Sequence, residues 1–161
     1  MIKRIFDIVL ALAAFVLLLP IFILISIFIK SGSKGPIFYL QTRVGKDGSD
    51  FKIFKFRTMY IDSDKSGLLT VGGNDSRITS VGKFLRNYKL DEIPQLINVL
   101  IGDMSLVGPR PEVRKYVDLY NSEQQRVLSV KPGITDYASI EYSLENELLA
   151  KASDPEKEYI E

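Results

Sequence analysis

A long apolar segment near the N-terminus is the feature that most constrains how this chain can fold. Between residues 8 and 29, only Pro20 and Ser26 interrupt a run of 22 otherwise apolar residues. As a helix with a rise of 1.5 Å per residue, this segment would be about 33 Å long, which is enough to cross a bilayer. The polar residues 30–34 offer no small-residue cleavage pattern like that of a signal peptide. The sequence therefore predicts a membrane segment that the protein retains.

The charges that flank this segment leave its orientation open. Lys3 and Arg4 precede it, and Lys30 and Lys34 follow it, so the positive-inside rule favours neither end. Pro20 removes a backbone hydrogen bond in mid-segment and can break a helix there, provided that the freed carbonyl groups find other partners. These residues are equally compatible with a straight spanning helix and with a re-entrant helix that turns back at Pro20.

Composition limits the chemistry that the rest of the chain can perform. The 161 residues are 46% hydrophobic and 25% charged, which suits one compact domain, and a net charge of +1 argues against a nucleic-acid-binding protein. The absence of Cys and His excludes disulfides, thiolate nucleophiles, imidazole bases and the usual zinc sites. Carboxylates, Lys or Tyr must therefore do any acid, base or metal work, and a metal held by carboxylates alone would be a hard ion such as Mg²⁺.

Beyond residue 35 the pattern becomes that of a β-hairpin. Residues 37–44 and 51–56 are rich in aromatic and β-branched side chains, and residues 45–49 between them supply turn chemistry. Residues 30–60 also hold seven Lys or Arg against two Asp. Most of these cations are expected on a solvated face beside anionic lipid headgroups.

The stretch from residue 90 to residue 111 combines a predicted helix with two adjacent acids. Apolar residues recur on one helical face at Ile93, Leu96, Ile97 and Leu100. Pro94 fits only in a first turn, and Gly102 can end the helix. Asp91 and Glu92 are therefore expected at a helix N-terminus.

Two interpretations of these acids are open. In the first, Asp91 is an N-cap and Glu92 favours the positive end of the helix dipole, which together stabilise the helix by about 1 kcal/mol. In the second, the helix start attracts phosphate and keeps Asp91 ionised, so that Asp91 can act as a nucleophile toward a phosphoryl group without a separate base. Arg86 and Arg110 could then neutralise the phosphate oxygens.

Two further helices are predicted around this stretch. Thr79 or Ser80 is expected to cap a short helix that carries Arg86 toward the acids. A second apolar stripe at helical spacing consists of Val113, Tyr116, Val117 and Tyr120. Core packing is its default interpretation, and a helix lying in the membrane interface is the alternative.

Residues 85–86, 90–100 and 102–111 resemble the bacterial sugar transferases called monotopic phosphoglycosyltransferases, and so do shorter pieces within residues 35–59 and 131–135. The resemblance implies an α+β fold with a re-entrant membrane helix in residues 1–30. A catalytic domain in residues 31–161 would hold the small β-hairpin and short helices packed at the membrane interface. The resemblance also favours a helix that turns back at Pro20, although Leu19 stands where members of the family commonly have Ser.

The resemblance also implies an activity. The protein would transfer a phosphosugar from a UDP-sugar to polyprenol (undecaprenyl) phosphate in the bacterial inner membrane, on its cytoplasmic face, and release UMP to start a lipid-linked glycan. Asp91 would form the covalent intermediate, Glu92 would position it, and Asp91 and Glu92 together would hold Mg²⁺. The residues implied to contact phosphate are Arg86, Arg110, Lys55 and Arg57. Residues 136–143 depart from the family pattern and lack its Arg, which puts in doubt any nucleotide or sugar contact that this Arg carries.

Other functions remain open at the level of sequence. Asp62 and Asp64 form a D-x-D pattern, as in metal-dependent glycosyltransferases that release UDP, although plain turn chemistry is the favoured interpretation. The same segment fails as a calcium loop because Gly73 occupies the position that needs Glu. A non-catalytic membrane scaffold with capping carboxylates is the third alternative. Neither the sugar nor the oligomeric state is fixed by the sequence.

Overall fold

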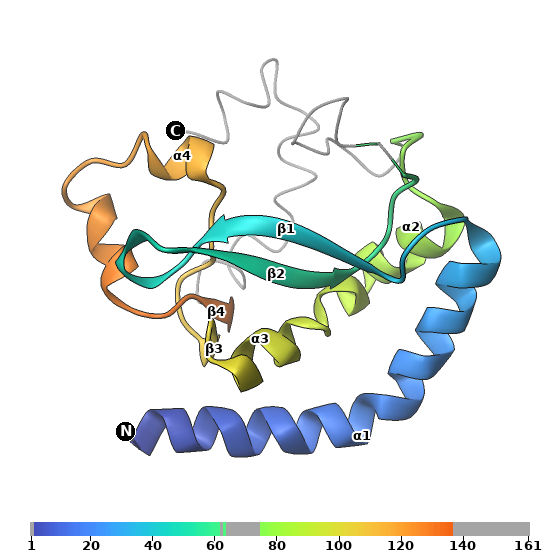
Figure 1. The fold of residues 1–161 in the computed structure, drawn as a ribbon, viewed down its shortest axis with the longest axis horizontal. Helices are drawn as coiled ribbons and strands as arrows, with labels where there is room; N and C mark the ends of the chain where they lie inside the picture. The colour runs from blue at the N-terminus through green and yellow to red at the C-terminus, as the bar shows by residue number, and fades with distance from the viewer. Residues whose placement is uncertain (1, 62, 64–74, 137–161) are drawn as a thin grey trace.

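The computed structural model describes residues 2–61, 63 and 75–136, in which helices and short strands alternate (Figure 1). In chain order, the elements are α1 (Ile2–Gly32), β1 (Phe38–Val44), η1 (Lys46–Gly48), β2 (Asp50–Phe56), α2 (Ser80–Asn87), η3 (Leu90–Glu92), α3 (Gln95–Ile101), β3 (Ser105–Val107), α4 (Arg114–Val117), η4 (Gln124–Ser129) and β4 (Gly133–Thr135). The mixture of helix and strand agrees with the expected α+β class. The D-x-D residues Asp62 and Asp64, the Gly73 position and residues 137–143 lie outside the described residues.

The long helix α1 lies along one side of the molecule and bends in its middle (Figure 1). Pro20 is the proline inside this helix, and the loss of its backbone hydrogen bond accounts for the bend. Both ends of α1 contact the rest of the chain. Near its start, Asp7 accepts hydrogen bonds from Ser105 Oγ at 2.9 Å and Leu106 N at 3.2 Å. At its end, Arg57 donates to the carbonyl oxygens of Ser33 and Lys34 at 2.9 and 2.7 Å.

One face of α1 is buried and the opposite face is apolar but exposed. The buried residues are Asp7, Ala11, Phe22, Ile25 and Ile29. On the other face, Leu17 is 78% exposed and Val16 is 63% exposed. The length and composition of α1 meet the requirements for a membrane-crossing helix. Because so much apolar surface would be unfavourable in water, this face suits contact with lipid.

The predicted hairpin is confirmed. Strands β1 and β2 pair antiparallel, with Phe38 opposite Phe56 and Val44 opposite Asp50. The turn between them contains η1, and Asp47 and Gly48 adopt positive φ angles of 56° and 73° there. A second, smaller sheet forms when β3 and β4 pair in parallel.

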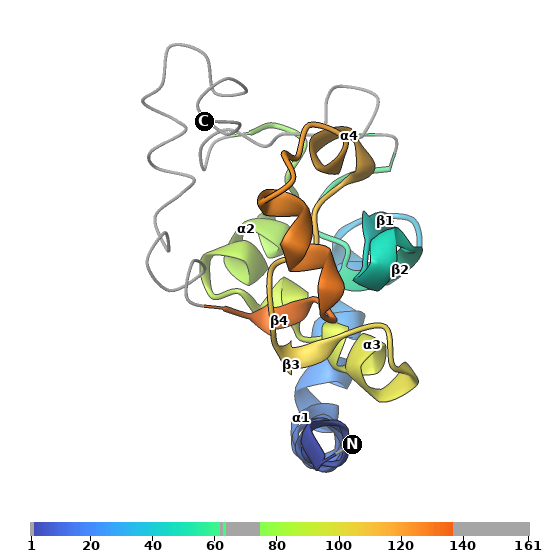
Figure 2. The same ribbon diagram turned by 90° about the vertical axis from the view of Figure 1, so that its left-hand side faces the viewer.

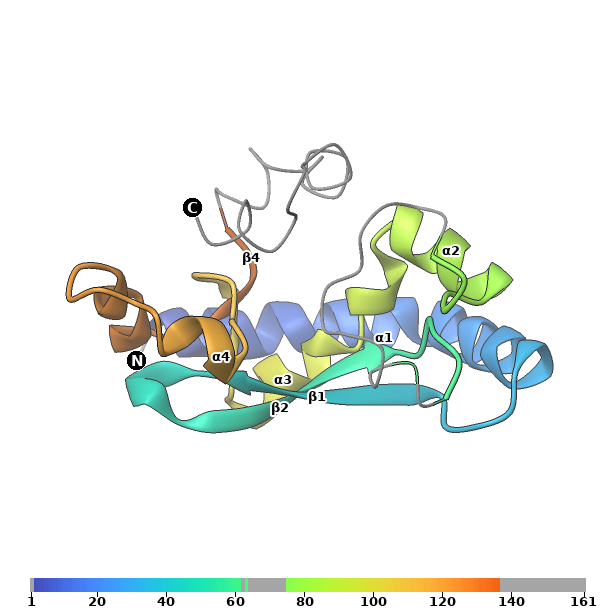
Figure 3. The same ribbon diagram turned by 90° about the horizontal axis from the view of Figure 1, so that it is seen from above.

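Helix α3 packs between α1 and the hairpin, so that it joins the two (Figures 1 and 2). One core cluster consists of Ala11, Ile53, Leu96, Val99 and Met104. A second cluster consists of Phe22, Ile25, Ile29, Phe56 and Leu85. Each cluster therefore combines residues of α1, β2 and one of the helices α2 and α3. Figure 3 shows α1 and the hairpin extending along the same direction.

The boundaries of the short helices confirm some expectations and correct others. Thr79 caps α2 by accepting a hydrogen bond from Gly82 N, and Gly102 ends α3 with φ 104°. Helix α3 begins at Gln95, with Pro94 at the N-cap position, so the expectation that Asp91 is the N-cap is wrong. Pro94 has no backbone N–H to continue the helical hydrogen bonds, so α3 does not extend N-terminally past it. Asp91 and Glu92 lie instead in the separate η3 turn. Helix α4 is a single turn, shorter than the stripe suggested, and Tyr116 and Val117 are buried in it.

Candidate active site

Asp91 and Glu92 lie in η3, between α2 and α3. Lys89 precedes this turn in a left-handed backbone conformation, with φ 56°, and connects it to the end of α2. Asp91 is buried, with 9% of its surface exposed, and the Glu92 side chain is 18% exposed. The turn therefore presents two adjacent carboxyl groups in a largely desolvated place.

Cations from distant parts of the chain surround Glu92. The Nζ atom of Lys55, on β2, lies 2.8 Å from Glu92 Oε1. The Nη2 atom of Arg110, in the segment after β3, lies 3.7 Å from the same oxygen. Burial alone would raise the pKa of Glu92, but Lys55, Arg110 and Lys89 outweigh it and lower the pKa to about 2. Glu92 is therefore a fixed negative charge at neutral pH.

Asp91 differs from its neighbour in its electrostatic balance. Burial raises the pKa of Asp91, the charge of Glu92 raises it further, and the cations Lys55 and Arg86 offset this effect only in part. The sequence suggests that a helix start keeps Asp91 ionised, but burial of Asp91 acts in the opposite direction and favours the protonated form. Two adjacent carboxyl groups with pKa values shifted in opposite directions are typical of sites that perform chemistry.

Arg86 reaches this site from the last turn of α2. Its Nε atom donates a hydrogen bond to Thr58 Oγ1 at 2.9 Å, and its charge is close enough to Asp91 to affect the pKa of that residue. The structure therefore brings Arg86, Lys55 and Arg110 together around the two acids. Lys55 lies on β2, Arg86 on α2, and Arg110 in the segment between β3 and α4.

Arg57, which the family resemblance implies as a phosphate contact, donates hydrogen bonds to residues just after α1. Its guanidinium is buried and donates to Ser33 O, Ser33 Oγ and Lys34 O, at 2.7 to 2.9 Å, rather than to a carboxylate. Gly35, with φ 125°, allows this contact, since a Cβ atom there would lie 1.9 Å from Arg57 Nη1. Arg57 thus connects the end of α1 to the end of β2.

Three residues near Arg86 were not singled out from the sequence. Thr58 is its hydrogen-bond partner, 28 positions away. Asp75 and Arg77 form a close ion pair, with Nη2 to Oδ2 at 2.6 Å and Nε to Oδ2 at 2.9 Å. The charge of Asp75 acts on Arg86. Nothing in the sequence pairs Thr58 with Arg86, whereas the spacing of Asp75 and Arg77 permits a local ion pair.

The acids at this site suit a hard metal ion. Asp91 and Glu92 supply adjacent carboxylate oxygens, and Mg²⁺ is commonly bound by one or two carboxylates together with substrate phosphates and water. Within residues 2–61, 63 and 75–136, no group of three or more acidic, His or Cys side chains is placed to hold a metal by itself. A magnesium ion held by these two carboxylates would need further oxygen ligands, which substrate phosphates and water can supply.

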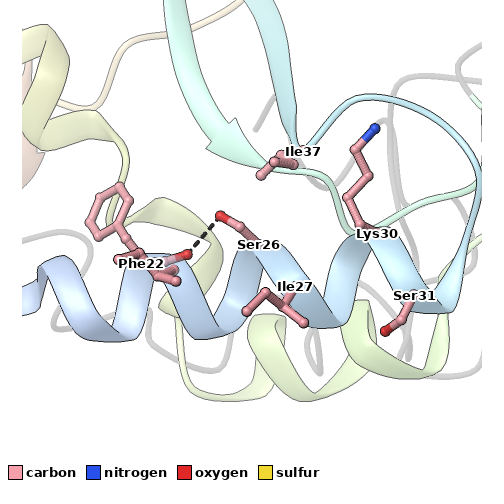
Figure 4. A pocket seen from close by; sticks show the side chains of 7 residues that line it. Phe22, Ser26, Ile27, Lys30, Ser31 and Ile37 are labelled. Carbon is pink, nitrogen blue, oxygen red and sulfur yellow. Dashed lines mark hydrogen bonds between the residues drawn. The ribbon is translucent and has the colours of Figure 1, made fainter.

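A separate apolar groove lies between the second half of α1 and the beginning of β1 (Figure 4). Its volume is about 560 Å³. The residues that line it are Phe22, Ile23, Ser26, Ile27, Lys30, Ser31 and Ile37. The hydroxyl group of Ser26 is committed to Phe22 O at 2.6 Å, four residues earlier in α1. The groove is thus mostly a feature of the apolar helix surface, with Lys30 as its charged member.

Several known proteins with similar sequences are named as sugar-phosphate transferases. The family model described as bacterial sugar transferase matches residues 1–161. The UDP-N-acetylgalactosamine-undecaprenyl-phosphate N-acetylgalactosaminephosphotransferase of Aeromonas hydrophila is 44% identical over 142 residues, 86% of this chain and 34% of that protein.

Two UDP-glucose:undecaprenyl-phosphate glucose-1-phosphate transferases are similarly close. The protein from Klebsiella pneumoniae is 43% identical over 86% of this chain and 30% of its own length. The protein from Escherichia coli is 42% identical over 87% of this chain and 31% of its own length. The chain thus spans about a third of the length of these relatives.

Proposed function

This chain belongs to the bacterial sugar transferase family, and from that premise we propose that it transfers a sugar 1-phosphate from a UDP-sugar to polyprenol phosphate and releases UMP. The names of its relatives support the donor and acceptor classes. The observation that carries the proposal is the placement of a buried Asp91 beside an ionised Glu92, with Lys55 and Arg86 from other elements around them. Such a cluster suits an anionic phosphate substrate.

In this proposal, Asp91 is the nucleophile. Its carboxylate oxygen forms a bond to the phosphorus next to the sugar, while the bond from that phosphorus to the oxygen of UMP breaks and UMP leaves. An oxygen of polyprenol phosphate then attacks the same phosphorus. The bond to Asp91 breaks, and the carboxylate is regenerated. The charges of Lys55 and Arg86 favour the ionised form of Asp91 against the effect of burial.

Glu92 and the arginines would position the diphosphate. Glu92 stays ionised through Lys55 and Arg110, and Arg86 and Arg110 supply planar groups that can each hold two phosphate oxygens. Asp91 and Glu92 are the residues proposed to hold Mg²⁺, which when bound would reduce the negative charge of the diphosphate. Arg57 is left out of this phosphate-binding set, because its guanidinium donates hydrogen bonds to Ser33 and Lys34.

We further propose that α1 is a re-entrant membrane helix that leaves both of its ends on the cytoplasmic face of the inner membrane. The bend at Pro20 supports this arrangement. So do the contacts of both helix ends with one folded body, through Asp7 to Ser105 and through Arg57 to Ser33. The acceptor lipid would then reach the site from the leaflet in which α1 lies.

The released nucleotide tests this proposal. Membrane-embedded protein should release UMP from a suitable UDP-sugar when polyprenol phosphate is present, and Asp91→Asn should abolish the release. Asp62→Asn and Asp64→Asn serve as controls and should keep turnover within a few-fold of the parent. Release of UDP, together with its loss in these two controls, would instead support the glycosyltransferase that the D-x-D pattern suggests.

A further inference from the structure

Thr58 occupies a rigid place beside the candidate active site. It follows the end of β2 by two residues and is 7% exposed. Its carbonyl oxygen accepts a hydrogen bond from Thr79 N at 2.9 Å and another from Thr79 Oγ1 at 3.2 Å. Thr79 itself is buried and is the N-cap of α2. The backbone of Thr58 is thus held against the start of the helix that carries Arg86.

Gly82 allows α2 to approach this backbone closely. A Cβ atom at Gly82 would lie 2.0 Å from Thr58 O, a distance that real atoms do not reach. Arg86 lies four residues beyond Gly82, one helical turn further along the same face. The docking of α2 on Thr58 therefore sets the position from which the Arg86 side chain extends.

The hydrogen bond between the two side chains fixes how the Arg86 guanidinium is presented. Arg86 Nε donates to Thr58 Oγ1 at 2.9 Å. Among the residues that the structure describes, the two terminal amino groups of Arg86 have no hydrogen-bond partner. A guanidinium held through Nε can still offer the fork formed by Nη1 and Nη2 to two oxygens of one phosphate group.

We propose that Thr58 is a positioning residue that acts through Arg86 and aims the free end of its guanidinium at a phosphate group of the UDP-sugar. This inference rests on the proposed function. Thr58 itself touches no reacting atom. Its role is to restrict the rotamers of the long Arg86 side chain before the substrate binds. Without this restriction, binding would have to order the side chain at a cost in conformational entropy.

Substitutions of Thr58 and Arg86 test this proposal in a double-mutant cycle. Thr58→Val removes the acceptor and keeps the shape of the side chain, so kcat/KM should fall about ten-fold, while Thr58→Ser should remain within about two-fold of the parent. In an Arg86→Lys background, which has no guanidinium fork, Thr58→Val should change kcat/KM by less than about two-fold. Thr42→Val is the matched control because the exposed Thr42 hydroxyl pairs with Lys52, outside the site.

Each alternative result overturns the proposal. An equal loss in Thr58→Ser and Thr58→Val would assign the effect to packing, and a full further loss in the Arg86→Lys background would show that Thr58 acts elsewhere. If a thermal melt shows that Thr58→Val is unfolded, Thr58→Ala replaces it, and the same about ten-fold fall in kcat/KM is expected. A parent protein that releases no UMP would refute the proposed function itself. A parent that releases UMP and a folded, fully active Thr58→Val would refute only the role of Thr58.

Discussion

The Nζ atom of Lys55 lies 2.8 Å from Oε1 of Glu92, although the two residues are 37 positions apart in the sequence. Lys55 belongs to the hairpin and Glu92 to the turn between α2 and α3, so this ion pair connects the hairpin to that turn. Both side chains are mostly buried, at 17% and 18% exposure. An ion pair this sheltered is screened less by solvent than a surface pair, and loss of one partner leaves a buried charge.

The stability of the fold should depend on the charge of Glu92 in metal-free buffer. The pKa of Glu92 is lowered from 4.5 to about 2. A carboxyl group with a lowered pKa stabilises the folded state above its unfolded pKa, and this stabilisation is lost as the pH falls through the folded value. The melting temperature of the parent should therefore fall more steeply between pH 4.5 and pH 2 than that of Glu92→Gln.

Asp50→Asn provides the control for this pH dependence, because it removes an exposed ion pair with Arg114. It should keep the slope of the parent. Equal slopes for the parent and Glu92→Gln would contradict the assigned environment of Glu92.

Replacing the arginines of the site by lysine should impair catalysis. An ammonium group acts as a point charge and cannot hold two phosphate oxygens as a guanidinium does. Arg86→Lys and Arg110→Lys should each lower kcat/KM by about ten-fold, or about 1.4 kcal/mol of transition-state stabilisation. The measurement is steady-state kinetics of each variant in the same nanodisc, after thermal melts confirm folding.

Two exposed lysines provide the controls for the arginine variants. Lys46 lies near Asp47 at 3.9 Å in the hairpin turn, and Lys115 lies over the ring of Tyr116. Lys46→Ala and Lys115→Ala should change kcat/KM by less than about two-fold. Equal, small effects in all four variants would mean that the arginines are ordinary surface charge.

Arg57→Met should affect stability more than activity. The substitution removes three hydrogen bonds to Ser33 and Lys34, and we expect a loss of about 2 kcal/mol in the free energy of unfolding. The value of kcat/KM per folded molecule should stay within about three-fold of the parent. Arg114→Met is the control, because the guanidinium that it removes is exposed and donates hydrogen bonds to Gly48 and Asp50. Full stability with lost activity would instead favour Arg57 as a diphosphate ligand.

The orientation of α1 can be tested by labelling, because the sequence has no Cys. Ile2→Cys and Lys46→Cys place single thiols near the helix start and in the exposed hairpin turn. In intact spheroplasts, neither should react with a membrane-impermeant maleimide, and both should react after permeabilisation. Pro20→Ala favours a straight helix and should expose the thiol at position 2 to the outside. Labelling of Ile2→Cys in the otherwise unchanged protein would rule out re-entry.

The sequence predicts the parts of this fold that depend on local chemistry. The hairpin follows from the turn residues 45–49, the start of α2 from Thr79, and the end of α3 from Gly102, because caps and turns are made by neighbouring residues. The length of α4 is less well predicted, since apolar spacing does not by itself determine how far a helix extends.

The sequence points to several residues of the candidate site, but it does not specify how they are arranged. Asp91, Glu92, Arg86 and Arg110 stand out within one continuous stretch of the sequence. The hydrogen bond from Arg86 to Thr58 and the upward pKa shift of Asp91 arise from packing between distant elements, which no sequence spacing specifies. Burial also separates Arg57 from the other cations, a distinction that charge alone does not make.

Covalent transfer through Asp91 is the central claim, and the mass of the intact protein tests it most directly. The membrane-embedded protein is incubated with a UDP-sugar that it turns over, without polyprenol phosphate, and its mass is then measured. We predict that the parent gains the mass of one sugar phosphate, that fragmentation places this group on Asp91, and that Asp91→Asn gains none. An unmodified parent that still releases UMP when the acceptor is added, or a modified Asp91→Asn, would contradict the account.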